Sequence, residues 1–296
     1  MDFTTVDGQV NLVDNMKHEL LHAIGFSVQL YAFFRDGRGR PRTPRNRAGK
    51  PPLHGKYFLY VAANSTVKRV ERKNWQIAGG NMTKNIHMLV TPRVRREVRR
   101  HFKCKSLEGG ELEDQGDFGT SLTHWEKRVF GDEAMTGNHQ QLNLDGRKWH
   151  ELAQISRITL AVLQDSGWYK VDFRKADPYT WGKGAGCTYA KKSCLQFMRE
   201  NNRTPRTSGG NAISPYCDKK SPLSVSRRKR QSNGCNKEIS TLFCNLIKYG
   251  KPLRREHQNL DFLEDDQTDL DHWGAGMWLA DFCPTTLRMY SMTCSS

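Results

Sequence analysis

The first residues in the chain that could do chemistry are His18 and His22, which stand four positions apart in the segment His-Glu-Leu-Leu-His. In an α-helix, residues four apart lie one turn above each other, so both imidazole rings can reach one metal ion. Glu19 lies between them, where its carboxylate could act on a zinc-activated water without binding the metal. The pattern therefore predicts hydrolysis at a zinc site. A pair of surface histidines is the alternative that these five residues leave equally open.

The sequence around this motif predicts the helix that would hold it. Apolar residues recur every four positions, which predicts a stripe buried in the core beside the histidines. These are Leu12, Met16, Leu20 and Ile24. Gly25 follows, and a residue without a side chain is typical of the end of a helix. We therefore expect the chain to turn away at Gly25 and to leave room for a third ligand.

Catalytic zinc usually takes three protein ligands and keeps its fourth position for water. Where the compact metzincin motif carries its third histidine, this chain has Val28, so the third ligand must come from further along. His124 is the strongest candidate of the ten histidines, because Met135 follows eleven residues later and a methionine turn beneath the metal is the second metzincin mark. A core or surface histidine at this position is one alternative, and an acidic third ligand, Glu126 or Glu133, is another.

With these motifs in place, the sequence resembles the leishmanolysin-like (invadolysin) zinc metalloproteases, which look like metzincins with a long insertion between the second and third zinc histidines. The resemblance covers most of the chain. The matching stretches are 18–27, 101–104, 107–109, 113–116, 124–128, 135–137, 165–169, 181–187 and 280–284. The resemblance implies that His18, His22 and His124 bind one zinc ion per chain, that Glu19 is the general base and that Met135 forms the methionine turn.

The same resemblance implies an α+β fold: a metzincin-like zinc protease core that lacks most of its N-terminal sheet subdomain and carries a Cys-rich, disulfide-stapled C-terminal domain. We divide the chain into a zinc helix (1–27), an insertion with a basic loop (28–118), a segment with the third ligand, the methionine turn and a core helix (119–178), and the Cys-rich domain (179–296). We also expect a strand at 57–61, a basic helix near 93–103, and a helix from Trp149 that ends at Gly167.

The zinc helix is expected to begin within the first dozen or so residues, whereas related enzymes have a pro-segment and a β-sheet subdomain before it. We therefore expect either a fragment of a longer product or a chain that has lost this sheet. In metzincins generally, the edge strand of the sheet holds the substrate backbone. A chain without it is expected to be a poor protease even with its ligands complete.

The cysteines indicate an oxidising compartment. Cys104 is alone in the first half, whereas the other seven lie between positions 187 and 294 and show no Cys-x-x-Cys spacing. An even number of cysteines in a loop-rich region is typical of disulfides, whose pairing the sequence leaves open. Sequons at Asn64, Asn81 and Asn202 fit the same compartment. We expect the secretory pathway and a cell-surface, membrane-associated or extracellular location, although no signal peptide or membrane-spanning stretch is recognised; a cytoplasmic location is the alternative.

The chain is strongly basic, with 47 Lys and Arg against 31 Asp and Glu and a net charge of +16. The excess gathers at positions 35–50, 93–105 and 227–230. A solvated face without a dedicated partner is the interpretation we favour, and an anionic glycan, an anionic membrane surface or RNA are the alternatives. No nucleic-acid fold signature accompanies these runs, so we expect no specific nucleic acid.

These observations predict a zinc-dependent metalloendopeptidase that hydrolyses internal peptide bonds of protein or peptide substrates, with Glu19 moving the proton from the water to the leaving amine. No serine-nucleophile motif or phosphate-binding glycine loop competes with this prediction. The alternative is an inactive truncated homologue that acts as an adhesion or binding module through its basic loops and Cys-rich domain.

Overall fold

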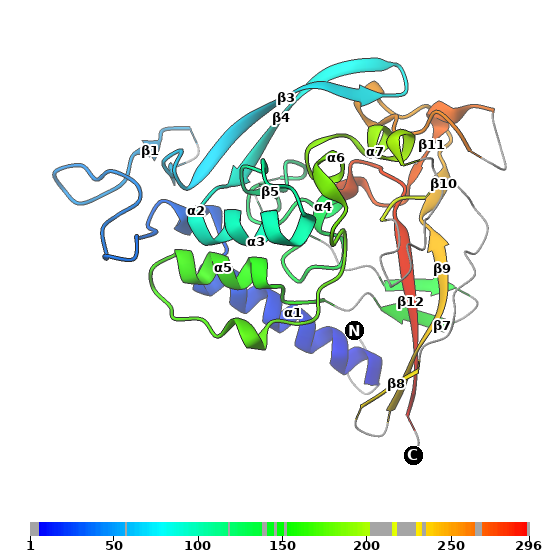
Figure 1. Cartoon of the computed structure of the whole chain (residues 1–296), viewed down its shortest axis with the longest axis horizontal. Helices are drawn as coiled ribbons and strands as arrows, with labels where there is room; N and C mark the ends of the chain where they lie inside the picture. Colours follow the sequence, from blue (N-terminus) through cyan, green and yellow to red (C-terminus); the bar gives the residue numbers. More distant parts are fainter. Residues whose placement is uncertain are drawn as a thin grey trace.

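The structure is a computed structural model, and it describes residues 6–56, 58–117, 119–137, 141–144, 147–150, 153–201, 215–217, 229–232, 235–263 and 268–294. Helices and antiparallel sheets are mixed along the chain, which confirms the predicted α+β class (Figure 1). No helix within the described ranges is both long and apolar enough to cross a bilayer.

The helices lie mostly in the first two thirds of the chain. The α-helices are α1 (Val6–Ile24), α2 (Val28–Tyr31), α3 (Pro92–Phe102), α4 (Lys127–Phe130), α5 (Arg157–Asp165), α6 (Gly186–Lys191) and α7 (Cys194–Glu200). The 3-10 helices are η1 (Phe173–Lys175), η2 (Arg255–His257), η3 (Leu270–His272) and η4 (Trp278–Ala280).

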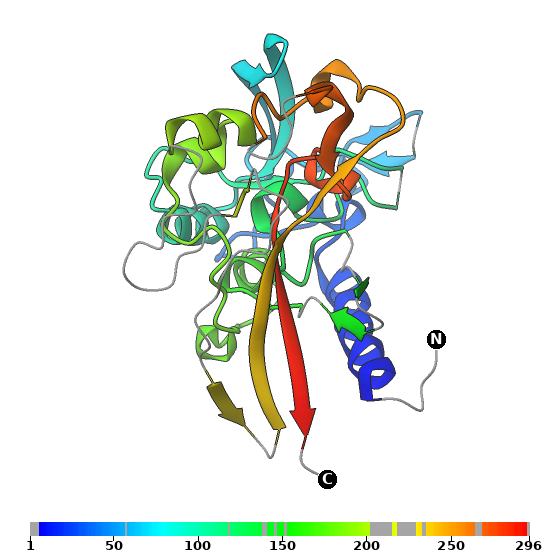
Figure 2. The ribbon, with the colours of Figure 1, turned by 90° about the vertical axis from the view of Figure 1, so that its right-hand side faces the viewer.

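The strands form several small antiparallel sheets rather than one large sheet. They are β1 (Leu53–His54), β2 (Leu59–Tyr60), β3 (Val67–Ile77), β4 (Gly80–Leu89), β5 (Gly110–Leu112), β6 (Gln141–Leu144), β7 (Arg147–His150), β8 (Lys229–Ser232), β9 (Cys235–Cys244), β10 (Leu246–Lys248), β11 (Trp273–Ala275) and β12 (Thr286–Cys294). The orders are β1-β2, β3-β4-β5, β6-β7, β12-β9-β8 and β10-β11. Figure 2 shows β9 and β12 as a long ribbon beside the helical part.

One hydrophobic cluster joins segments that lie far apart in the sequence. It contains Leu21 from α1, Ile86 from β4, Trp125, Tyr189 from α6 and Cys283. All four segments predicted from the sequence therefore contribute to a shared core, and their division into separate domains stays a prediction.

The predicted buried stripe on α1 is wrong. Leu12, Met16 and Leu20 are 38%, 62% and 59% exposed, whereas Leu21 is 6% exposed and Ile24 packs against the core. The period of four is helical, but α1 turns the side that carries its histidines and Leu21 inward, so the 12-16-20 row faces away. As predicted, the helix ends at Ile24, just before Gly25.

The predicted helix from Trp149 to Gly167 is wrong at its start. Trp149 belongs to β7, position 152 lies outside the described residues, and α5 begins at Arg157. Ser156 fixes this boundary because its hydroxyl accepts hydrogen bonds from the first free backbone N–H groups of α5. Near the predicted end, Gly167 adopts φ 79°, and a Cβ there would lie 2.7 Å from a backbone oxygen.

The insertion contains more structure than the sequence suggested. Of the strand expected at 57–61, only Leu59 and Tyr60 form strand pairing, as β2. Residue 57 lies outside the described ranges. The long hairpin of β3 and β4 was not predicted. The expected basic helix is α3, whose first backbone N–H groups bond to the buried carboxylate of Asp165, with Arg93 N at 2.6 Å.

Three disulfides are described: Cys104–Cys187, Cys194–Cys283 and Cys217–Cys244. Two lie within the Cys-rich segment as expected. The first instead joins it to the insertion, because the end of α3 packs beside α6. The two remaining cysteines, at 235 and 294, are register partners on β9 and β12, and their side chains lie outside the description.

Candidate metal centre

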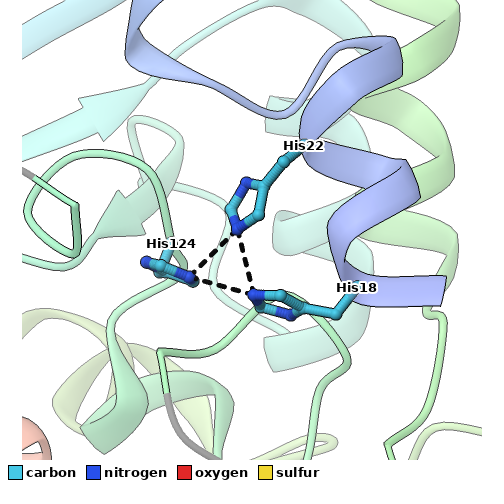
Figure 3. A group of neighbouring side chains, drawn as sticks. All are labelled: His18, His22 and His124. Atoms are coloured by element: carbon cyan, nitrogen blue, oxygen red, sulfur yellow. Dashed lines mark hydrogen bonds between the residues drawn. The ribbon is translucent and has the colours of Figure 1, made fainter. Parts of the chain in front are cut away.

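Three histidines predicted as ligands converge on one point (Figure 3). The Nε2 atoms of His18 and His22 are 3.0 Å apart, and each lies 3.1 Å from Nε2 of His124. His18 and His22 come from successive turns of α1, and His124 approaches from the loop before α4. The long-range partner that the helix motif required is therefore present.

The other ring nitrogen of each histidine is held by the backbone. His18 Nδ1 lies 2.6 Å from the carbonyl oxygen of Ala134, His22 Nδ1 lies 2.7 Å from that of Phe26, and His124 Nδ1 lies 2.9 Å from that of Thr120. A carbonyl oxygen only accepts, so each Nδ1 carries the proton and each neutral ring turns an Nε2 lone pair toward the other two.

This arrangement fits a metal ion. Three lone pairs that face one another repel unless a cation lies between them, and backbone bonds that fix the ring orientation are typical of metal-bound histidines. Nitrogens 3.0–3.1 Å apart can all contact one ion at zinc–nitrogen distances of about 2.0–2.1 Å. Burial lowers the pKa of His18, which keeps this ring neutral; the Ala134 hydrogen bond and the nearby Glu19 carboxylate oppose this effect.

The turn around Met135 supports the first histidine. Met135 is fully buried, its carbonyl oxygen accepts from Trp125 N at 2.8 Å, and Ala134 supplies the carbonyl that holds His18. Trp125 packs edge-on against Phe26 at 4.8 Å. The chain thus ties the methionine turn, the segment of His124 and the exit of α1 into one support.

The buried carboxylate of Glu133 anchors the same turn. One oxygen accepts from Met135 N at 2.6 Å, and the other accepts from Ser156 N at 3.1 Å, from Ser156 Oγ at 2.6 Å and from the Thr159 hydroxyl. Burial raises the pKa of Glu133, and these hydrogen bonds oppose the shift. Glu133 therefore acts as an anchor of the turn, and its oxygens are already engaged away from the three rings.

The other alternative acid, Glu126, also has a structural place. Its carboxylate caps α4 by accepting from Arg128 N at 3.1 Å, and it lies in a buried acidic cluster with Glu113 and Asp114. Lys84 forms an ion pair with Asp114 at 3.4 Å. Among the described residues, the group that converges with His18 and His22 is therefore a histidine and not an acid.

Glu19 lies on the solvent side of the site. Its side chain is exposed and its charge acts on His18, as expected for the residue that follows the first histidine on α1. This position leaves the carboxylate accessible to solvent.

Sequence reasoning missed the groups that orient the rings. The three carbonyls belong to Ala134, Phe26 and Thr120, and no residue type marks them because every residue carries a carbonyl. The anchor role of Glu133 was also missed: it was weighed only as a ligand. The Glu-Ala-Met-Thr-Gly segment around Met135 was the available signal, since it indicated a tight turn.

A triangle of imidazoles from one helix and one distant loop, with a glutamate after the first histidine, is the arrangement of a metallopeptidase. Comparison with known proteins gives the family. The Peptidase_M8 (leishmanolysin) family model matches residues 53–296, which include His124 and Met135 and begin after α1. The chain belongs to the leishmanolysin family of metallopeptidases, as its sequence predicted.

Relatives from animals and a protozoan agree with this assignment. The chain is 44% identical to the leishmanolysin-like peptidase of Drosophila melanogaster over 275 residues, which cover 92% of this chain and 37% of the relative. It is 41% identical to the leishmanolysin-like peptidase of Caenorhabditis elegans over 280 residues, covering 92% and 39%, and 26% identical to the leishmanolysin of Leishmania donovani over 209 residues, covering 68% and 28%. The chain thus spans less than half the length of these relatives.

Proposed function

We propose that this chain is a zinc-dependent metalloendopeptidase in which His18, His22 and His124 hold one zinc ion and Glu19 is the general base. The observation that carries the proposal is the triangle of Nε2 atoms, 3.0–3.1 Å on each side, with all three Nδ1 atoms bound to backbone carbonyls. Three neutral nitrogen ligands leave a fourth position for water or substrate, as in catalytic rather than structural zinc sites.

When bound, zinc supplies a Lewis acid that polarises the water and the scissile carbonyl. The residues of the chain do the rest. Glu19 accepts the proton of the attacking water and later delivers it to the leaving amine, so no covalent intermediate with the protein is needed. Its exposure gives the carboxylate access to both water and substrate. The carbonyls of Ala134, Phe26 and Thr120 keep the rings in the orientation that this chemistry needs.

Replacement of Glu19 by Gln tests the base. The amide has the same shape but accepts no proton, so Glu19→Gln should bind about one zinc per chain, like the parent, and lose at least about 100-fold in turnover of an unfolded protein substrate. Glu71→Gln makes the same chemical change on the exposed surface of β3 and should keep the parent's activity. Activity of Glu19→Gln within tenfold of an active parent would exclude Glu19 as the base.

Chelation separates the enzyme from the adhesion or binding module. Peptidase activity that a chelator abolishes and added zinc restores is expected of the enzyme. A chain that binds zinc but shows no such activity in either the parent or Glu19→Gln would favour the binding module. Because the chain spans 37% of the Drosophila relatives, this comparison should also be made with any longer product that contains it.

The partners that we propose are protein or peptide substrates, and the location is the secretory pathway or the cell surface. The disulfides support this location, because such bonds persist in oxidising compartments. Cell fractionation with an antibody to the chain tests it, and recovery in the cytosolic fraction with free thiols would contradict it.

A further inference from the structure

A hollow of about 330 Å³ lies beside the C-terminal half of α3, and none of the three histidines of the metal centre lines it. It is formed by the end of α3, the start of α5 and residues 177–183, and Figure 1 shows α3 and α5 side by side. Its lining includes four cationic side chains: Arg100, Lys103, Arg157 and Lys183. The volume falls at the lower end of the range of small-ligand sites, roughly 300–1,000 Å³.

The arginines around this hollow outnumber the carboxylate that they share. Glu97 is 2% exposed and pairs with Arg100, with Arg157 at 3.2 Å and with Arg96 at 3.7 Å. One carboxylate holds these three guanidinium groups in place but neutralises only one charge. The shared contact therefore builds a fixed positive site.

Two lysines add charge that the described structure does not balance. Lys103 and Lys183 are exposed, and within the described ranges neither ammonium group has an ion pair or side-chain hydrogen bond. The second carboxylate of the lining, Asp177, accepts a hydrogen bond from Ile155 N at 2.8 Å. His101 contributes no charge at neutral pH, because burial lowers its pKa to about 4. The lining is thus four cations against two carboxylates.

The charges continue from the hollow along α3. Arg96, Arg100 and Lys103 are spaced four and three residues apart, so they lie on one side of the helix and span about 10 Å. None of the exposed large apolar side chains of the described residues lies in α3 or at 177–183. A membrane-binding helix buries such side chains in the lipid, so this cationic row favours a linear, water-soluble polyanion.

We propose that the hollow and the outer row of α3 bind a sulfated glycan of the heparin type. One sulfate group lies in the hollow between Lys103 and Lys183, and further groups follow Arg100 and Arg96 along the helix. Guanidinium groups suit such anions because they offer two parallel N–H donors. This binding needs neither zinc nor Glu19, so it stands or falls separately from the peptidase activity.

The test is a titration of the zinc-loaded chain of 296 residues with a heparin oligosaccharide at increasing NaCl. Lys103→Ala/Lys183→Ala removes two cations from the hollow. Arg47→Ala/Lys50→Ala removes two exposed cations from the basic loop and is the matched control. We expect the hollow variant to bind on the order of tenfold more weakly at 0.15 M salt and to lose about two from the slope of log Kd against log salt, and the control to change little.

Equal losses in the two double variants would overturn the proposal, because net charge alone would then explain the binding. Equal affinity for hyaluronan, which has carboxylates but no sulfates, would overturn the sulfate assignment. Tighter binding to single-stranded RNA or to phosphatidylserine vesicles that is lost in the hollow variant would assign the site to those partners instead. Unchanged melting temperatures of both double variants exclude misfolding. If Lys103→Ala/Lys183→Ala melts at a lower temperature than the parent, Lys103→Gln/Lys183→Gln replaces it in the titration.

Discussion

Glu133→Gln is the sharpest test of how the fold supports the metal centre, because it changes one atom of a buried group that binds no metal in our account. The Glu133 carboxylate joins the turn of Met135 to the N-terminus of α5 through Ser156 and Thr159. The neighbouring residue, Ala134, orients His18. Weakening this anchor should therefore lower the affinity for zinc, although no metal ligand is changed.

The magnitude follows from the donors around the carboxylate. One oxygen accepts from three donors and the other from Met135 N alone. The best placement of the new amide sets its oxygen among the three donors and its NH2 group against Met135 N–H, which loses its acceptor. The loss of a hydrogen bond to a charged group and the unpaired buried donor should together cost about 2 kcal/mol of the free energy of unfolding.

Calorimetry and a competition assay with a zinc chelator measure both consequences. We expect the melting temperature to fall by roughly 4–8 °C and zinc affinity to fall about tenfold, as for other groups that orient a ligand. The exposed Glu71→Gln should shift neither value. A Glu133→Gln variant with the parent's melting temperature and zinc affinity would refute the anchor, and complete loss of zinc would instead favour Glu133 as a ligand.

Three further predictions concern the fold. Gly167→Ala should destabilise the chain by about 1–3 kcal/mol in thermal unfolding, because φ is positive there and the new Cβ would lie 2.7 Å from a backbone oxygen; an unchanged melting temperature would contradict this. Cys104→Ser/Cys187→Ser should cost about 2–4 kcal/mol, and non-reducing peptide mapping of the parent should recover the 104–187 pair; another pairing would contradict the structure. Burial lowers the pKa of His101 to about 4, below the unfolded value of about 6.5, so the unfolded chain binds more protons in this window and stability should fall as pH drops from about 6.5 to 4. His101→Gln should flatten this dependence, and an equally steep profile would assign it to other groups.

The part of the site that sequence predicts is the part set by local geometry. Two histidines four residues apart need only a helix to meet, so His18 and His22 could be paired before any fold was known. His124 was reached through its distance to Met135 and the family resemblance, and the structure places its Nε2 atom 3.1 Å from both partners. The carbonyls that orient the rings depend on how distant segments pack, which residue types do not encode.

The errors on the helices have the same origin. A period of four at Leu12, Met16 and Leu20 predicts a helical row but does not say which row faces the core. The apolar spacing from Trp149 onward suited a helix, yet β7 pairs with β6 there and Ser156 starts α5 later. Periodicity alone does not reveal which residues pair as strands or which residue caps a helix, so the predicted element boundaries were wrong.

The disulfide partner of Cys104 could not be predicted from the sequence for a related reason. Its partner, Cys187, is 83 residues away, and only the packing of α3 beside α6 brings the two together. Eight cysteines allow 105 pairings, so an even count indicates disulfides without selecting any. The seven cysteines between positions 187 and 294 suggested a self-contained domain, whereas this bond ties that region to the insertion.

The proposed function requires that three histidines, and no acid, hold one catalytic zinc ion. X-ray absorption at the zinc edge, recorded on the purified chain and on His124→Ala, tests it most directly. We expect about one zinc per chain with three imidazole nitrogens at about 2.0–2.1 Å and one further light atom from water, and loss of bound zinc in His124→Ala. A parent spectrum with only two imidazoles, or zinc held as tightly in His124→Ala as in the parent, would contradict it.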